Sequence, residues 1–240
     1  MALFSLSGGL VYHLRALRYR ESLWAPFRSA LATWLTERLP SSAELVLVGP
    51  SAGHCLPLAE LSRFGKITVL EPDPLARRLL ARRLRPAHIQ LESRDLLLEP
   101  LLTGSAGLDG LLQQRPAASL LFCNLLGQLR FDLGDEQQAR FEAEFRRRLL
   151  PLLAGRRWAS FHDYWSLDRD RAEPCPTRLD FARQPDADEL GVACFGARGA
   201  PVTVLDHGTS ALFPAGLPRR YFSWQITPAA LHIVEAVAGH

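Results

Sequence analysis

Two glycines and an acidic residue stand where this sequence could bind a ligand. Gly49 and Gly53 bound a five-residue turn that follows the apolar run at 45–48, and Glu71 ends a second apolar run. Glycine lets a backbone turn sharply and lets a ligand approach without a Cβ in the way. A helix that starts after such a turn offers free backbone N–H groups. The pattern predicts a nucleotide-cofactor site at the end of the first strand.

The elements around this turn are indicated by apolar runs that alternate with amphipathic stretches. The first run is apolar at every position, as strands buried on both faces of a parallel sheet are. The sequence predicts strands over 45–49, 66–71, 88–95, 119–126 and 157–165, with helices over 53–64, 73–84 and 135–153. Asp73 is placed to cap the helix at 73–84, and Pro74 suits its first turn. The segment after the third strand, rich in leucine and glycine, is predicted to be a loop.

The two ends of the chain extend this core. Apolar residues recur at helical spacing over 10–39, and Pro26 predicts a split into two helices. The polar stretch at 166–190 is predicted to be a loop with at most one short helix. Short strands with short connections follow it, which favours antiparallel pairing. We expect these strands at 191–195, 201–206, 220–227 and 231–237.

The spacing of the glycines separates two kinds of cofactor loop. The dinucleotide fingerprint places a third glycine five positions after the first, where this chain has His54, and that argues against a nicotinamide oxidoreductase. The Gly49 to Gly53 spacing resembles instead the loop of the Rossmann-like, class I S-adenosylmethionine-dependent methyltransferases. The resemblance covers about 44–165 and marks the chain as a divergent member.

The resemblance implies a cofactor, S-adenosylmethionine, and a place for each of its parts. Glu71 would accept the ribose hydroxyls, Asp95 would take the adenine amino group, and the segment 123–129 would face the methionine part. The expected cofactor-binding residues are Gly49, Pro50, Ser51, Ala52, Gly53, Glu71, Pro72, Asp95, Leu96, Cys123 and Asn124.

The fold implied is α/β: a Rossmann-like three-layer sandwich with a mostly parallel seven-stranded sheet, an antiparallel C-terminal edge and preceding N-terminal helices. We expect one methyltransferase-like domain over 1–240. Within it, 1–40 would be a helical cap, 41–165 the cofactor-binding core and 166–240 the antiparallel part.

Three departures from the family pattern keep a second hypothesis open. Ser51 replaces the middle glycine, Leu47 replaces a frequent acid, and the fourth strand lacks the Asn-Pro-Pro-aromatic signature. These departures motivate an alternative in which the chain is a degenerate, non-catalytic binding or regulatory module.

Polar residues after the strands are candidates for chemistry on the methyl acceptor. We expect His162 and Asn124 to be catalytic, although a strand-end contact explains His162 equally well. Because side chains alternate along a strand, His162 and Asp163 should point to opposite faces. Trp224 and His232 are interpreted as core or edge residues. The expected substrate-binding residues are Tyr12, His13, Arg20, Gln128, Asp163 and His207.

The composition of the sequence limits the kinds of protein and of partner that remain possible. The net charge of +3 over 240 residues does not by itself indicate nucleic acid, and arginines at 15–28, 77–85 and 146–157 are interpreted as solvated helix faces. Four scattered cysteines predict no metal cluster, and no apolar run approaches the roughly 18 residues of a membrane span. We expect a cytoplasmic protein with a small-molecule substrate, with protein or nucleic acid left open, and a candidate homodimer edge at 221–238.

Overall fold

Nine strands pair into one sheet in the computed structural model, which describes residues 9–84, 89–129, 133–168, 175–181, 184–195 and 203–240. Their order across the sheet is β3-β2-β1-β4-β5-β9-β8-β6, with β7 paired to β5. The strands are β1 (Glu44–Val48), β2 (Lys66–Leu70), β3 (Ile89–Glu92), β4 (Ser119–Cys123), β5 (Trp158–Asp168), β6 (Arg178–Leu179), β7 (Thr203–Asp206), β8 (Arg219–Thr227) and β9 (Ala230–Gly239).

The strand directions confirm the expected fold class. Strands β1 to β5 are mutually parallel, and the strands after them pair antiparallel. The described part of the sheet has nine strands where seven were expected. The order reverses between β1 and β4, the place where open α/β sheets bind ligands beyond the carboxyl ends of their strands. The glycine turn follows β1 and therefore lies at this reversal.

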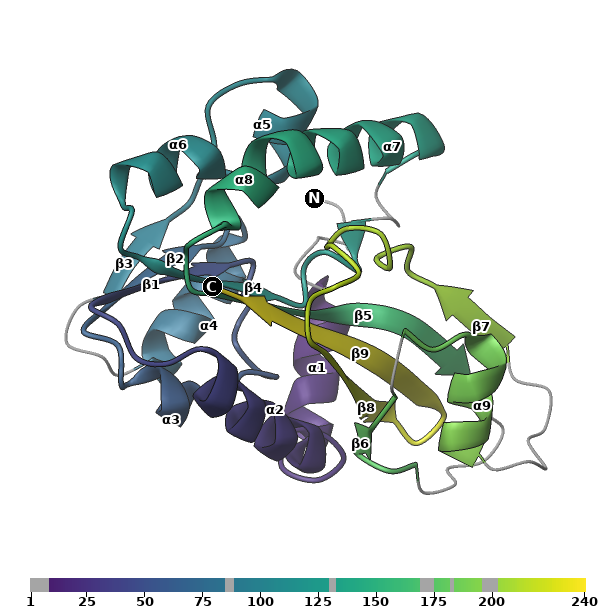
Figure 1. Cartoon of the computed structure of the whole chain (residues 1–240). Coiled ribbons are helices and arrows are strands. Elements are labelled where there is room, and N and C mark those ends of the chain that lie inside the picture. Colours follow the sequence, from purple (N-terminus) through teal and green to yellow (C-terminus); the bar gives the residue numbers. More distant parts are fainter. Residues whose placement is uncertain (1–8, 85–88, 130–132, 169–174, 182–183, 196–202) are drawn as a thin grey trace.

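Helices cover both faces of the sheet (Figure 1). On one face, α1 (Gly9–Tyr19), α2 (Ala25–Arg38), α3 (Leu58–Leu61) and α4 (Pro74–Arg83) enclose one apolar core. On the other face, α5 (Leu98–Thr103), α6 (Leu108–Gln114), α7 (Asp135–Glu144), the π-helical turn η2 (Phe145–Leu149) and α8 (Leu150–Leu153) enclose a second. A short helix, α9 (Ala187–Phe195), packs against the far end of β5. The three-layer arrangement is as expected.

Two helix starts agree with the sequence. The Asp73 carboxylate accepts hydrogen bonds from the N–H groups of Leu75 and Ala76, so it caps α4 as predicted. Pro26 lies in the first turn of α2, where a missing N–H costs nothing, and it separates α1 from α2.

The helix expected after the glycine turn is much shorter than predicted. A helix was expected over 53–64, whereas α3 is a single turn, Leu58–Leu61. Pro57 precedes it, and proline both lacks the N–H and disfavours helical geometry in the residue before it. The turn therefore leads into irregular chain before α3 begins. Helices α5 and α6 occupy the segment expected to be a loop.

The strand expected at 191–195 is helical. The side chain of Asp186 accepts a hydrogen bond from the N–H of Glu189 at 2.9 Å, and Glu189 accepts one from the N–H of Asp186 at 3.0 Å. This reciprocal capping box starts α9. Its pattern, Asp186 followed three residues later by Glu189, indicates a helix, and the prediction of a strand at 191–195 did not take it into account.

Three predicted segments lie partly outside the described residues. They are the strand expected from position 88, the strand expected from 201, of which 201–202 are not described, and parts of the loop expected at 166–190. Within the expected homodimer edge, β9 lies between β5 and β8 and is an interior strand. The homodimer stays a prediction.

A β-bulge in β5 decides which residues share a face. Asp163 pairs with Val234 and Ser166 pairs with His232, with the register shifting at Tyr164. The extra residue places Asp163 and Ser166 on the same face of the sheet, and Tyr164 and Trp165 together on the other, where their rings stack. Bulges often re-aim side chains beside functional sites.

Candidate functional site

The turn after β1 is held in the left-handed backbone region. Gly49 has φ +62°, Ser51 +50° and Gly53 +65°. Ser51 therefore adopts the glycine-like conformation that its position in the turn requires. A non-glycine residue in this region is uncommon, and such residues concentrate at functional sites.

Glu71 closes this turn from the neighbouring strand. One carboxylate oxygen accepts a hydrogen bond from the backbone N–H of Ser51 at 2.8 Å, and the other accepts one from the N–H of Asp73 at 3.0 Å. The side chain is buried, with 4% exposure. Burial raises the pKa of Glu71, and the two N–H groups oppose that rise. The carboxylate is thus fixed at the end of β2, beside the turn of β1.

In the described structure Asp95 caps the start of helix α5. Its carboxylate accepts hydrogen bonds from the N–H groups of Leu97, Leu98 and Glu99, at 2.8 to 3.0 Å, at the start of α5. The side chain is half-buried, and it lies one residue before Leu96, the other residue expected at the adenine.

The end of β4 lies across the order reversal from the turn. Asn124 follows this strand with φ +54°, and its Nδ2 donates to an oxygen of Asp163 at 3.2 Å. Because Nδ2 faces a carboxylate, the amide orientation is fixed, and Oδ1 is left buried without a partner among the described residues. The next residue, Leu125, covers Gly49: a Cβ added to Gly49 would lie 2.8 Å from Leu125 Cδ2.

A second group of polar residues surrounds Asp163. The carboxylate is fully buried, and one of its oxygens accepts hydrogen bonds from the side-chain amides of Asn124 and Gln128. Its other oxygen lies 3.1 Å from Nδ1 of His232. Burial opposes ionisation, yet the nearby His232 and His207 and the Asn124 amide lower the pKa of Asp163 below its ordinary value. Asp163 is therefore an anion held between two amides and a histidine.

His207 lies next to this group, and both of its ring nitrogens have hydrogen-bond partners. Its Nδ1 lies 2.6 Å from the carbonyl oxygen of Gly127, and its Nε2 lies 2.6 Å from Ser166 Oγ. A carbonyl only accepts, so Nδ1 carries the hydrogen and Nε2 accepts from the serine hydroxyl. Burial lowers the pKa of His207, and Asp163 and the Gly127 carbonyl oppose that effect.

His162 lies on the opposite face from Asp163, as the alternation predicted. It is fully buried, with Nδ1 2.9 Å from Ser160 Oγ and Nε2 3.2 Å from Glu235. Glu235 also receives the hydroxyl of Tyr221 at 2.7 Å and the Arg219 guanidinium at 2.6 Å. Both ring nitrogens of His162 are thus used inside this network, which favours a structural role over catalysis.

Helix α1 brings Tyr12 and His13 against the glycine turn. Arg83 donates to Nδ1 of His54 at 3.0 Å and to the carbonyl oxygen of Ala52 at 2.5 Å. Arginine only donates, so the hydrogen of His54 is on Nε2, 3.3 Å from Nδ1 of His13. His13 must then carry its hydrogen on Nε2, a buried atom without a partner in the described part of the chain.

The same cluster carries positive charge at Arg83. Burial, together with Arg83, His13, Arg20 and Arg28, lowers the pKa of His54 to about 3. Within the described residues, no carboxylate lies within ion-pair distance of Arg83. An N–H donor at His13 in these surroundings suits an acceptor or anionic group of a ligand.

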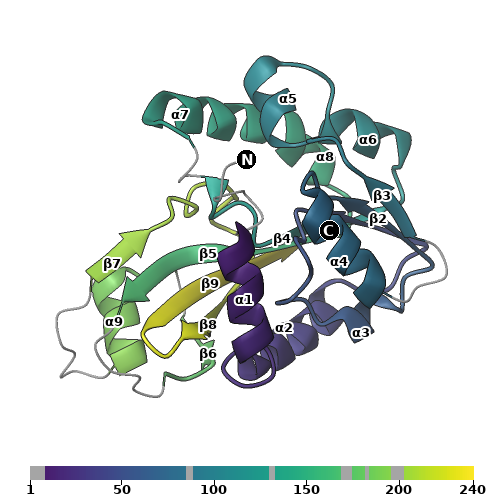
Figure 2. The same cartoon turned by 180° about the vertical axis from the view of Figure 1, so that it is seen from behind.

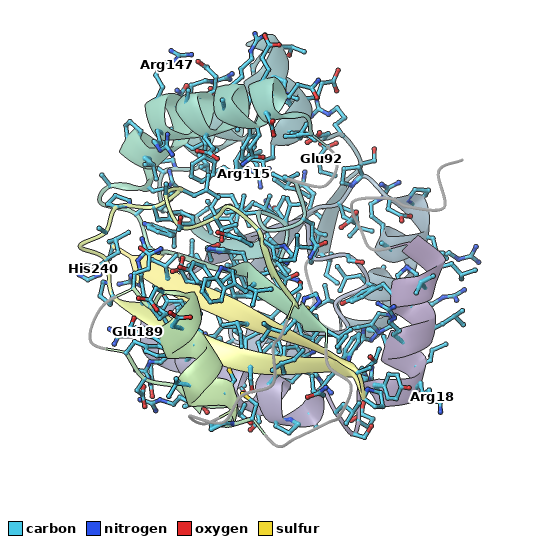
Figure 3. The ribbon with its side chains drawn as sticks, turned by 90° about the vertical axis from the view of Figure 1, so that its right-hand side faces the viewer. Arg18, Glu92, Arg115, Arg147, Glu189 and His240 are labelled. Carbon is cyan, nitrogen blue, oxygen red and sulfur yellow. The ribbon has the colours of Figure 1, made fainter. Side chains whose placement is uncertain are left out.

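The arginines expected on solvated helix faces are exposed only in part: Arg156 is buried and donates to the carbonyl oxygens of Leu112, Arg115 and Ala118, and Arg148 pairs with Asp109 at 10% side-chain exposure. Arg18 on α1 and Arg147 on η2 extend outward from the protein (Figure 3). Arg20 pairs with Glu21 on the surface, and its charge contributes to the lowered pKa of His54.

The structure thus brings most of the candidate residues into two groups. One joins the turn, Glu71, Tyr12 and His13; the other joins Asn124, Gln128, Asp163 and His207, with His162 on the far face. His232 was interpreted as a core or edge residue and belongs to the second group. Its contact with Asp163 depends on long-range pairing of β5 with β9 and on the bulge, so no local pattern indicated it.

Among the described residues, no group of three or more His, Cys, Asp and Glu side chains is placed to hold a metal ion. No helix in the described ranges has the length and apolar character that crossing a bilayer requires.

No protein-family model and no curated protein matches the sequence. Solved structures with a similar fold include a complex of DhpI with SAM and HEP, which shares 15% identity over 96% of this chain and 94% of that chain, with a TM-score of 0.42. The N-methyltransferase NodS from Bradyrhizobium japonicum WM9 shares 14% over 90% and 97%, with a TM-score of 0.45. A SAM dependent methyltransferase from Aquifex aeolicus shares 14% over 91% and 92%, with a TM-score of 0.41. At these scores the likeness concerns the fold, and no role of a residue is taken from it.

Proposed function

We propose that this protein is an S-adenosylmethionine-dependent methyltransferase whose cofactor lies across the carboxyl ends of β2, β1 and β4. The observation that carries the proposal is the buried carboxylate of Glu71, fixed beside the left-handed turn at the reversal of strand order. Carboxylates at such a place accept hydrogen bonds from ribose hydroxyls. When bound, the cofactor supplies an electrophilic methyl group on a cationic sulfur.

The described residues suit the chemical groups of this cofactor. The buried, unpartnered Oδ1 of Asn124 is an acceptor for the ammonium of the methionine part. The N–H of His13 is a donor for an acceptor oxygen on the ligand. Asp95 and Leu96 would lie at the adenine, and Pro50, Ala52, Pro72 and Cys123 would line the site through backbone and apolar contacts. Alignment and exclusion of water supply much of the rate in such displacements.

The acceptor is proposed to be a small molecule that binds near Tyr12, Arg20, Gln128, Asp163 and His207. The chain is proposed to act in the cytoplasm as one domain over 1–240.

Thermal unfolding with added ligand tests the cofactor directly. A ligand at 100 times its dissociation constant stabilises the folded state by about 2.7 kcal/mol, which raises the melting temperature measurably. We expect S-adenosylhomocysteine to raise it and NADH to leave it unchanged. A rise with NADH alone would instead revive the oxidoreductase hypothesis.

A second candidate function is supported by Leu125. Its side chain covers Gly49, and both oxygens of Glu71 are already bound by backbone N–H groups. These contacts are those of a closed site, as in a non-catalytic binding or regulatory module. Leu125→Ala separates the two: a parent protein that binds no S-adenosylhomocysteine while Leu125→Ala binds it would favour the closed module.

A further inference from the structure

His232 pairs with Asp163 through atoms that have no other partner. Its Nδ1 lies 3.1 Å from Asp163 Oδ1, and among the described residues neither atom has a hydrogen bond elsewhere. The two atoms are within ion-pair distance and do not form a directed hydrogen bond in this structure. Catalytic hydrogen bonds are often poorly aligned before substrate binds and tighten in the complex.

The surroundings of Asp163 fix the hydrogen of His232. The other oxygen of Asp163 is occupied by the amides of Asn124 and Gln128, so the carboxylate is held in place. An ionised carboxylate only accepts hydrogen bonds, so the contact favours the tautomer of His232 that carries its hydrogen on Nδ1. Its Nε2 is then a free base, and the side chain is 21% exposed, whereas Asp163 is fully buried.

The other two histidines near this group are different. Both ring nitrogens of His207 and both of His162 have partners inside the protein. Of these three histidines, His232 alone combines a carboxylate on one nitrogen with access to solvent.

The pair is also connected to the proposed cofactor site. Asn124 ends β4 beside the turn, and its amide contacts Asp163 directly. Asp163 and His232 face the same side of the sheet as α1, and Figure 2 shows that β5, β9 and β8 continue beyond that helix. An acceptor molecule above this part of the sheet would lie beside both sites.

We propose that His232, positioned by Asp163, is the general base of the methyl transfer, and that the acceptor is a hydroxyl compound. This proposal rests on the proposed function. A base is needed when the acceptor must lose its proton as it reacts, and an alcohol or phenol must, whereas a neutral amine attacks through its lone pair without first losing a proton. The acceptor oxygen forms the new bond to the methyl carbon and gives its proton to Nε2 of His232. The electron pair of the broken carbon–sulfur bond stays on sulfur, and the resulting imidazolium is stabilised by Asp163.

The protonation state of His232 can be measured without any turnover. Nitrogen-15 NMR of the full chain should show the neutral form of His232 with hydrogen on Nδ1 and none on Nε2. In Asp163→Asn that preference should be lost, provided circular dichroism shows the variant folded. Hydrogen on Nε2 of the parent protein would overturn the proposal, whether or not the variant folds.

Kinetics then test the acceptor class. Phenol and benzyl alcohol, with benzylamine for comparison, would be offered with a labelled methyl donor. We expect His232→Gln to reduce the rate on the hydroxyl compounds by about 10²- to 10⁴-fold, the usual contribution of a general base. Its affinity for S-adenosylhomocysteine should stay within about twofold of the parent's, and His240→Gln, at the exposed C-terminus, is the matched control.

The outcomes distinguish the two proposals. An unchanged rate in His232→Gln, or transfer by the parent protein to benzylamine alone or to none of the three, overturns the base and the acceptor class. Absence of S-adenosylhomocysteine binding overturns the proposed function, and the NMR result then decides the Asp163–His232 pairing by itself.

Discussion

The carboxylate of Glu71 accepts a hydrogen bond from the backbone N–H of Ser51 at 2.8 Å. This contact joins the end of β2 to the turn after β1 through the backbone of residue 51, which has φ +50°. The serine therefore preserves the turn geometry that a glycine would give, and its presence does not disrupt the turn. The relationship explains how a serine at the middle of the turn coexists with a formed loop.

Gly49 should tolerate alanine poorly for two separate reasons. Alanine would be strained at φ +62°, and its Cβ would lie 2.8 Å from Leu125 Cδ2. Strain of this kind costs about 1–3 kcal/mol, and the clash adds to it. Urea unfolding of Gly49→Ala should show a larger loss of stability than Gly104→Ala, since Gly104 has φ +82° with nothing within 4 Å of an added Cβ. Equal losses of stability in the two variants would mean that Leu125 does not pack closely against the turn at Gly49.

Glu235 should contribute to the stability of the folded protein through its pairing with Arg219. Glu235→Gln leaves the Arg219 guanidinium, with 7% side-chain exposure, without its carboxylate. Removing one partner of a buried ion pair costs about 3–5 kcal/mol, so denaturant unfolding should show a loss of that order. The exposed pair Arg147–Glu144 is the control, and Glu144→Gln should change stability little. A Glu235→Gln protein that is as stable as the parent would contradict the structural role given to His162 and its network.

The free energy of unfolding should decrease as the pH is lowered, and part of this decrease should depend on His54. Burial, together with Arg83, His13, Arg20 and Arg28, lowers the pKa of His54 in the folded protein to about 3, below the ordinary value of 6.5. The unfolded chain then binds more protons between these values, so the free energy of unfolding rises with pH. The contribution of His54 to the free energy of unfolding is fully present above pH 6.5 and is lost as the pH falls towards 3.

Urea titrations at several pH values measure this dependence. His54→Gln should flatten the pH dependence relative to the parent, because glutamine keeps an acceptor for Arg83 and does not titrate. Parallel curves for the two proteins would show that His54 is not held neutral by its neighbours.

The parallel core of the fold could be predicted because its signals are local. The apolar runs of β1, β2 and β4, and the cap and proline at Asp73 and Pro74, each indicate an element without reference to distant residues. The two wrong predictions, a helix at 53–64 and a strand at 191–195, have local causes as well. Pro57 prevents the long helix expected at 53–64, and the capping box of Asp186 and Glu189 makes a helix of an apolar run that resembles a strand.

The candidate site was predictable only in part, because half of it depends on long-range pairing. Glu71 and the turn come from adjacent strands, so their contact was within reach of the sequence. The meeting of Asp163 with His232 requires β9 to insert between β5 and β8, and it requires the bulge at Tyr164. Neither the insertion nor the bulge has a local signature, so His232 was interpreted as a core or edge residue.

Calorimetric titration of S-adenosylhomocysteine into the parent protein and Glu71→Ala tests the central claim most directly. The account predicts one site in the parent and an affinity about 10- to 150-fold weaker in Glu71→Ala, since hydrogen bonds to a charged group contribute about 1.5–3 kcal/mol. Circular dichroism must show the variant folded, and Glu144→Ala on α7 should bind as the parent does. No heat with the parent protein, or equal affinity in Glu71→Ala, would contradict the account.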